Sequence, residues 1–189
     1  MQAVALFSLA TGFAAAQVLS LGIEGGVPLN PLLTGTPPGY EIETHPYTVG
    51  PHVQVRLPRR FSFEADLLYK RLAYTYGGTD PVAIDRWELP LLLGYRFTDR
   101  GWQPFVHLGG ALNRVVHVEG VNVAELRHQA TQGITAGAGV ERRVGRLRFA
   151  PEFCITHWRD HNLGVHDAPL RSNLTQLELL VTVSHAWGP

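Results

Sequence analysis

The segment 157–167 carries the side chains best suited to metal chemistry. Ligand types that zinc and related ions use stand at His157, Asp160, His161, His166 and Asp167. Their spacing matches no metal-binding motif, however, and a polar surface loop has the same composition. We therefore predict a surface loop here, with no metal and no cofactor.

Nucleophilic side chains have equally little support. Cys154 has no histidine and asparagine arranged around it in the sequence, so we interpret it as a buried structural thiol. Ser184 and His185 are adjacent, and neighbouring residues of a strand point to opposite faces. The glycine-rich run at 133–139 lacks the strand-to-helix context of a nucleotide-binding loop. The sequence therefore predicts no catalytic or cofactor-binding residue.

The composition limits the remaining classes. The chain has 189 residues, enough for one domain and hardly enough for two. Its 16 lysines and arginines balance 16 aspartates and glutamates, so no basic excess indicates a nucleic-acid partner. A single cysteine excludes an internal disulfide framework. Hydrophobic residues make up 45%, yet the mean hydropathy is −0.01, a mixture that suits a chain whose apolar and polar residues alternate.

An apolar stretch opens the chain, from Ala3 to Ala16. A helix that crosses a bilayer needs roughly 20 residues, and this stretch is shorter. It ends in three alanines before Gln17, a pattern typical of signal-peptidase cleavage. We predict a signal peptide over 1–16 and one barrel domain over 17–189. Met1-Gln2 carries no positive charge, so a buried first helix or strand is the alternative.

Period-two alternation dominates the rest of the chain. In the clearest segment, Arg86–Phe97, every second residue from Trp87 to Phe97 is apolar. A strand that crosses a membrane needs about nine to eleven residues. We predict eight strands, over Leu19–Leu29, Tyr47–Leu57, Phe61–Lys70, Arg86–Phe97, Gln103–Val116, Gln132–Arg142, Leu147–Trp158 and Gln176–Trp187. Pro104 falls near a strand start, whereas Pro90 and Pro151 are expected to mark bulges.

The predicted connections alternate between short and long. Short turns are expected at Pro58–Arg60, Thr98–Gly101 and Arg143–Arg146, and long loops at Asn30–Pro46, Leu72–Asp85, His117–Thr131 and Arg159–Leu174. This alternation is typical of membrane barrels with short periplasmic turns and long outer loops. The predicted fold class is all-β, an eight-stranded antiparallel up-and-down transmembrane β-barrel.

The polar face of these strands mixes charges with glycine, alanine and serine, which suits a narrow interior filled by side chains. Charges held away from water must be paired. We therefore predict a lumenal salt-bridge network and no open pore, formed by Glu24, Arg56, Glu64, Asp66, Lys70, Arg86, Glu88, Arg96, Glu141, Arg148, Glu152 and Glu178.

Large aromatic residues lie near the ends of the predicted strands, where membrane barrels place belts at the two interfaces. At the outer interface we expect Tyr47, Tyr69, Trp87 and Trp158. At the inner interface we expect Phe61, Phe97, Trp102 and Trp187.

The chain resembles the small outer-membrane β-barrel superfamily, the OmpA/OmpX-like barrels. The resemblance rests on LGIEGGVPLN, GPHVQVRLPRRFSFEADLLYKR, WELPLLLGYRF, PFVHLGGA, GAGVERRVGRLRFAPEF and LELLVTVSHAW. It implies the outer membrane of a Gram-negative envelope, contact with membrane lipid and lipopolysaccharide, and insertion by the outer-membrane assembly machinery as a monomer. Such barrels commonly end in an aromatic residue, whereas here Gly188 and Pro189 follow Trp187.

The predicted role is non-enzymatic: envelope integrity, adhesion or recognition through the outer loops. The first and fourth loops are the expected contact surfaces because of their length. One alternative is a lipid A-modifying enzyme, since a deacylase among such barrels uses a histidine and a serine two residues apart. Trp158 and Arg159 follow His157, so no serine has that spacing here. The other alternative is a soluble lipocalin-like binder, with its apolar face inside.

Overall fold

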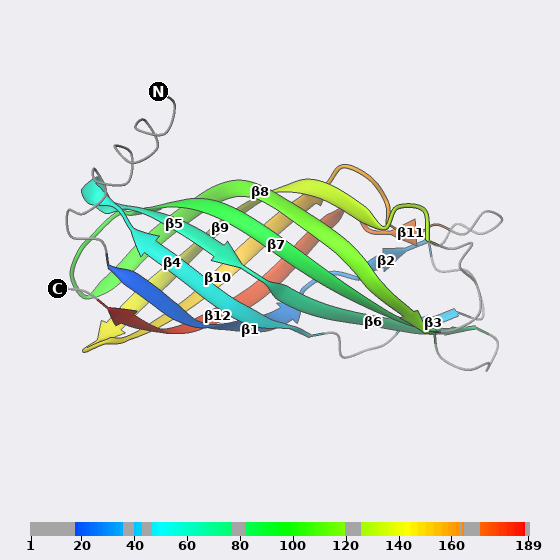
Figure 1. Cartoon of the computed structure of the whole chain (residues 1–189), viewed down its shortest axis with the longest axis horizontal. Helices are drawn as coiled ribbons and strands as arrows, with labels where there is room; N and C mark the ends of the chain where they lie inside the picture. Colours follow the sequence, from blue (N-terminus) through cyan, green and yellow to red (C-terminus); the bar gives the residue numbers. More distant parts are fainter. Residues whose placement is uncertain are drawn as a thin grey trace, which may run out of the picture.

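Figure 1 shows a cylinder of tilted strands. The computed structural model describes residues 18–35, 40–42, 47–76, 82–119, 126–162, 164 and 171–187. Within these ranges, no helix is both long and apolar enough to cross a membrane. The predicted signal peptide and the terminal Gly188 and Pro189 lie outside the described residues.

Eight antiparallel strands form the barrel wall, one of them in two pieces. They are β1 (Leu19–Pro28), β4 (Thr48–Arg56), β5 (Phe61–Asp66) continued by β6 (Leu68–Tyr76), β7 (Val82–Arg96), β8 (Trp102–Glu119), β9 (Ala130–Val144), β10 (Leu147–Trp158) and β12 (Thr175–Trp187). Each pairs with its neighbours in the chain, and β1 closes the cylinder by pairing with both β12 and β4. The predicted fold class is confirmed.

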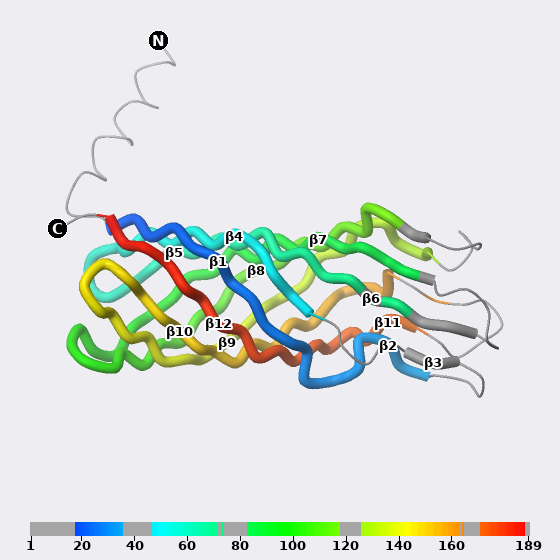
Figure 2. The backbone as a smooth tube through the Cα atoms, turned by 90° about the horizontal axis from the view of Figure 1, so that it is seen from below, coloured from blue at the N-terminus to red at the C-terminus, as the bar shows by residue number. Residues whose placement is uncertain are grey.

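The strand ends that the short turns join lie at one end of the barrel, and the strand ends that the long connections join lie at the other, as the tube in Figure 2 shows. The short pieces β2 (Leu33–Thr34), β3 (Tyr40–Ile42) and β11 (Arg171–Ser172) lie at the end with the long connections. Leu19 pairs with Trp187 at the other end, where the short turns are. One of these turns is the 3₁₀ turn η1 (Pro58–Arg60), in which Arg59 has a φ of 60°.

The strands extend further than the sequence predicted at the end with the long loops. The expected loop 72–85 is mostly strand, because β6 continues to Tyr76 and β7 already begins at Val82. At the opposite end β9 continues to Val144, so Gly145 and Arg146 alone form the turn into β10. Gly145 has a φ of 63°, a conformation that glycine adopts without steric cost.

The prolines interrupt the hydrogen-bond ladder without causing bulges. Leu67 separates β5 from β6, and its N–H donates to the Pro51 carbonyl oxygen at 3.1 Å. Pro51 has no N–H, so it cannot donate a hydrogen bond back to the Leu67 carbonyl. The register of β7 against both pieces places Pro90 opposite Asp66. The expected bulges at Pro90 and Pro151 are wrong: the register shift of the β7–β8 pair lies between Asp85 and Arg86.

The two faces of the wall have opposite chemistry. Inside are charged, amide and hydroxyl side chains, with a few apolar ones such as Leu92 and Leu180. Outside are large apolar side chains, exposed to between 36% and 71%; examples are Leu21, Ile23, Val53, Phe63, Leu93, Leu108, Ile134, Phe149, Phe153 and Val183. The inside of the barrel is therefore polar and its outer surface apolar.

Candidate functional site

The twelve residues of the predicted network all face the interior, and ten of them are at most 6% exposed. Arg56 and Arg86 are slightly more open, with side chains 11% exposed. Because these residues come from seven of the eight wall strands, their contacts connect opposite sides of the cylinder.

The half nearer the long connections contains the Lys70 cluster, which comprises Lys70, Arg86, Glu88, Gln176 and Glu178. Lys70 Nζ lies 2.5 Å from Glu88 Oε2 and 2.6 Å from Glu178 Oε2. Arg86 Nη2 lies 2.6 Å from Glu88 Oε1 and donates to Gln176 Oε1 at 3.0 Å. These buried charges therefore neutralise one another within hydrogen-bonding distance.

The half nearer the short turns contains a second group around Arg148. Glu141 contacts both Arg56 and Arg148, the latter at 2.8 Å from Nε. Arg96 is also buried, but its Nε and Nη1 have no hydrogen-bond partner. The structure therefore brings most of the predicted cations into ion pairs and leaves part of the Arg96 guanidinium unpaired.

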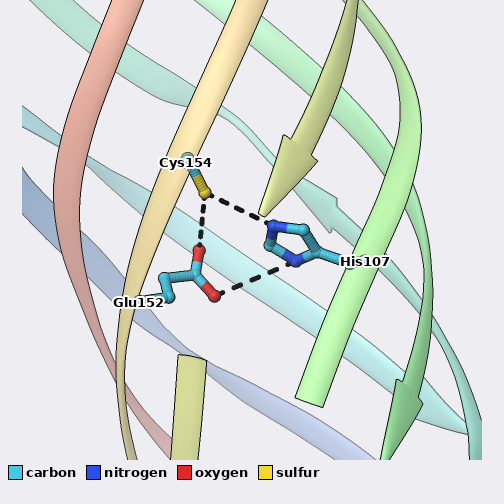
Figure 3. A group of neighbouring side chains, drawn as sticks. All are labelled: His107, Glu152 and Cys154. Atoms are coloured by element: carbon cyan, nitrogen blue, oxygen red, sulfur yellow. Dashed lines mark hydrogen bonds and ion pairs between the residues drawn. The ribbon is translucent and has the colours of Figure 1, made fainter. Parts of the chain in front are cut away.

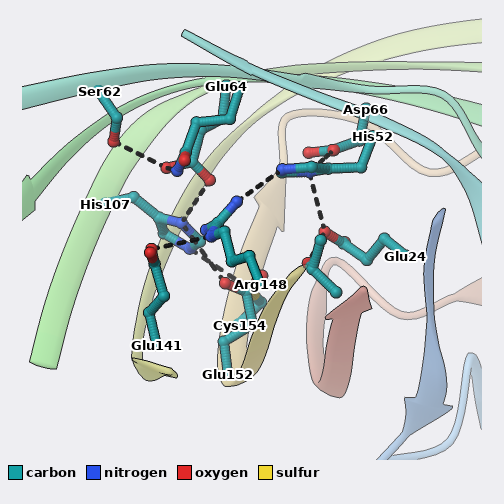
Figure 4. A network of polar contacts seen from close by, with 12 residues as sticks. Glu24, His52, Ser62, Glu64, Asp66, His107, Glu141, Arg148, Glu152 and Cys154 are labelled. Atoms are coloured by element: carbon teal, nitrogen blue, oxygen red, sulfur yellow. Dashed lines mark hydrogen bonds and ion pairs between the residues drawn. The ribbon is translucent and has the colours of Figure 1, made fainter. Parts of the chain in front are cut away.

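Two interior histidines were missing from the predicted network. His52 Nδ1 lies 2.5 Å from Asp66 Oδ1, and Arg148 Nη1 lies 3.1 Å from His52 Nε2 (Figure 4). Arginine only donates, so His52 Nε2 accepts and its Nδ1–H donates to Asp66. Both ring nitrogens are therefore engaged. The polar face of β4 showed His52 in the sequence, but not its partners.

His107 is the other missed residue. Its Nε2 lies 3.3 Å from Cys154 Sγ, and Cys154 is also 3.3 Å from Glu152 Oε1 (Figure 3). Nδ1 of His107 is 3.9 Å from Glu152 Oε2 and 4.0 Å from Glu64 Oε2. Cys154 is 3% exposed, which agrees with the predicted burial, but the sequence gave no sign of the neighbouring imidazole.

The outward aromatic residues cluster near both ends. The Tyr69 ring lies 6.3 Å from that of Tyr47, in a tilted arrangement, and 5.4 Å from that of Trp87, edge to face. At the opposite end Tyr95 contacts Phe61 and Phe97, and Arg142 lies over Trp102.

Trp158 does not belong to these outward groups, and its predicted place in the outer belt is wrong. It is 2% exposed and points inside, with the Arg86 guanidinium 5.9 Å from its ring. The prediction used its height along the strand, but strand alternation places Trp158 on the same face as Cys154 and Thr156.

Comparison with solved structures places this architecture among known folds. The outer membrane protein OprG from Pseudomonas aeruginosa aligns with a TM-score of 0.60 at 12% identity, over 92% of this chain and 96% of that one. The N-terminal β-barrel domain of Pseudomonas aeruginosa OprF gives 0.52 at 14% identity, over 90% and 97%. Neisserial surface protein A gives 0.53 at 13% identity, over 91% and 97%.

The chain has the fold of the small outer-membrane β-barrels. No family model and no curated protein matches its sequence. At 12–14% identity the likeness shows the fold, and the activity has to be argued from the residues.

Two adjoining hollows, of about 560 and 790 Å³, mark the outer wall of this small barrel over β7, β8 and β9. They share Leu112, Gln132 and Arg159. Gly110 lines the larger one, where an added Cβ would meet only the Gly133 carbonyl, at 3.9 Å. The hollow therefore exists partly because the wall lacks a side chain at this position.

His157 lines the same hollow, and its Nδ1 lies 2.9 Å from the Thr175 hydroxyl on β12. The sequence showed no hydroxyl at the right spacing because this partner comes from another strand. The other loop residues do not gather into a metal site: Asp160 is exposed, and His161 Nδ1 lies 2.6 Å from the Ser172 carbonyl oxygen. His166 and Asp167 lie outside the described residues. Ser184 is buried inside, while His185 is on the opposite face, as predicted.

Proposed function

We propose that the chain is an integral outer-membrane protein with a closed polar lumen and a non-enzymatic role. The observation that carries this proposal is the distribution of side chains on the wall, which is the reverse of that in a soluble barrel. Charged side chains point inside, and large apolar side chains point outside. Water penalises such an apolar exterior, whereas lipid is a suitable solvent for it. A soluble lipocalin-like binder needs the opposite arrangement and does not fit.

Strand length and closure support the same proposal. The wall strands, with β5 and β6 taken together, contain between nine and 18 residues, enough to cross a bilayer when tilted. Because β1 pairs on both sides, the wall has no open edge with unsatisfied backbone groups facing lipid. The chain can therefore satisfy its backbone hydrogen bonds without water along most of the wall.

The interior supports a structural or recognition role over transport. Two small cavities along the lumen measure about 20 Å³ each, close to the space of a single water molecule. Ion pairs such as Lys70–Glu178 and Arg56–Glu141 link non-adjacent strands across the interior. We infer that solutes do not pass and that activity resides in the long connections at one end.

The proposed orientation follows from the ends of the barrel. An even strand number leaves the start of β1 and the end of β12 beside the short turns, which we assign to the periplasm. The long connections then face outward, for envelope integrity, adhesion or recognition. In this proposal residues 1–16 are removed on export, the assembly machinery inserts the chain as a monomer, and lipopolysaccharide surrounds the outer aromatic residues.

The test is refolding of residues 17–189 from urea into detergent micelles, followed by semi-native electrophoresis of boiled and unboiled samples. A closed membrane barrel resists the gel detergent and migrates as a compact band until it is boiled. We expect this shift, and aggregation when the micelles are omitted. A monodisperse protein in plain buffer with no shift would contradict membrane insertion.

A second candidate is a lipid-modifying activity, favoured by the contact between His157 and the Thr175 hydroxyl beside the outer-wall hollow. A histidine within hydrogen-bonding reach of a hydroxyl is the arrangement of a general base and its nucleophile. Lipid A from cells that express the wild type, H157A, T175A or the outward control H185A would be compared by mass spectrometry. Acyl loss that depends on His157 and Thr175 supports this candidate; identical profiles reject it.

A further inference from the structure

The side chains of His107, Glu152 and Cys154 converge inside the barrel from two strands that do not pair with each other. His107 on β8 and Cys154 on β10 are both register partners of Gly137 on the strand between them. A Cβ at Gly137 would lie 1.9 Å from His107 Nε2 and 2.9 Å from Cys154 Sγ. The missing side chain therefore allows the imidazole and the thiol to meet across β9, with Glu152 two residues before Cys154 on the same face.

We propose that His107, Glu152 and Cys154 bind a single divalent transition-metal ion of the zinc class inside the lumen. One ligand atom from each residue lies within 4.8 Å of the others. The separations from Cys154 Sγ to His107 Nε2 and Glu152 Oε1 are both 3.3 Å. Bonds of about 2.0–2.3 Å to one ion place neighbouring ligand atoms at about such separations. Thiolate, imidazole and carboxylate together are a zinc-type donor set.

The charges around the cluster also indicate a missing cation. The carboxylates of Glu152 and Glu64 both face His107, at 3.9 and 4.0 Å from its Nδ1. Glu152 is 6% exposed, yet among the described residues no lysine or arginine lies within 4.0 Å of it. A buried carboxylate that contacts no lysine or arginine is unfavourable by several kcal/mol, and a cation bound to its oxygen lowers that cost.

The charges balance when the ion binds. Cys154 loses its thiol proton to the buffer as the sulfur–metal bond forms, so one proton is released per ion, and the thiolate and the Glu152 carboxylate neutralise the two positive charges. His107 binds as neutral imidazole through Nε2, which leaves Nδ1–H directed at Glu64, the orienting arrangement common around metal-bound histidines. The cavity of about 20 Å³ beside Cys154 and Glu152 can hold a water molecule as a fourth ligand.

The other compact group of possible ligands, Glu24, His52 and Asp66, is less suitable. His52 accepts from Arg148 through Nε2 and donates to Asp66 through Nδ1, so neither nitrogen is available. Arg148 would also place a positive charge beside the ion. In the His107 group, in contrast, the ligand nitrogen Nε2 faces a thiol and not an arginine. Among the described residues no arginine forms an ion pair with its Glu152 within 4.0 Å.

The test uses residues 17–189 refolded into micelles with Co²⁺ as a spectroscopic probe or with Zn²⁺, followed by removal of unbound metal. We expect one metal per chain by elemental analysis, and for Co²⁺ a thiolate charge-transfer band with the visible bands of a tetrahedral site. H107Q, E152Q and C154S should each lower the affinity at least about tenfold, and C154S should abolish the charge-transfer band. H185Q, which alters an outward histidine, should bind like the wild type.

The heat-dependent gel shift establishes that each variant has folded before its metal content is measured. E152Q preserves the shape of the site, so it decides the outcome if C154S fails to fold. No bound metal in the folded wild type would overturn the proposal. Metal bound equally by the wild type, E152Q and H107Q would also overturn it, since it would assign binding to surface histidines.

Discussion

The buried ammonium of Lys70 contacts two carboxylates, and this makes it sensitive to substitution. K70M would leave Glu88 and Glu178 without this cation inside the lumen, which we expect to lower the free energy of unfolding by about 3–5 kcal/mol. Urea unfolding of the protein in lipid vesicles, followed by tryptophan fluorescence, measures the change. The exposed pair of Arg60 and Asp99 is the control: R60A should cost less than about 1 kcal/mol. Equal losses would contradict the burial of Lys70.

The tryptophans report directly which face of the wall meets lipid. Trp158 is 2% exposed inside, whereas Trp102 is 55% exposed outside. The test uses two variants, one that retains only Trp102 and one that retains only Trp158, with every other tryptophan replaced by phenylalanine. Quenchers attached to lipid chains should reduce the fluorescence of Trp102 and leave that of Trp158 nearly unchanged. Comparable quenching of both tryptophans would show that Trp158 reaches lipid. It would then support the prediction that Trp158 belongs to the outer aromatic belt.

What sequence could predict about residues depended on local information. Alternation alone identified the faces of Glu64, Glu88 and Lys70, because side-chain direction has period two. It could not identify the partners of His107, which come from β10 and from β5 and depend on register. The same limit hid the contact between His157 and Thr175.

At the scale of the strands, the long alternating segments were predicted closely, and Leu147–Trp158 matches β10 at both ends. The wrong predictions concern features that depend on how two strands pair. The register shift between Asp85 and Arg86 depends on the pairing of β7 with β8, which the sequence of one strand does not reveal. The bulges predicted at Pro90 and Pro151 are absent, and the register of the strands continues through both prolines.

The break between β5 and β6 is expected to close when Pro51 is replaced. P51V supplies an N–H opposite Leu67, whose own N–H already donates to residue 51, so a second hydrogen bond can form. We expect slower amide hydrogen exchange at Leu67 and a free energy of unfolding higher by up to about 1 kcal/mol. P58A, in the turn η1 outside the ladder, is the control and should leave exchange at Leu67 unchanged. Unaltered exchange in P51V would attribute the break to another cause.

For the molecule as a whole, a closed ring of strands and a lumen filled by side chains are two different properties. A closed ring of eight strands can still conduct if its interior is loosely packed, so the fold alone does not decide permeability. Here the interior side chains form ion pairs between strands at several levels, and two cavities among the described interior residues are each near the size of one water molecule. A solute would have to break several buried ion pairs in succession, each at a cost of several kcal/mol.

We therefore expect liposomes that contain the refolded protein to swell in isotonic sugar no faster than protein-free liposomes. A general porin at the same protein-to-lipid ratio provides the positive control, and the heat-dependent gel shift of the recovered protein shows that insertion succeeded. K70M, with its cation removed from the lumen, tests whether the ion pairs cause the closure: if they do, this variant admits sugars or small ions more readily than the wild type. Rapid swelling with the wild type would contradict a filled lumen and would make the barrel a channel.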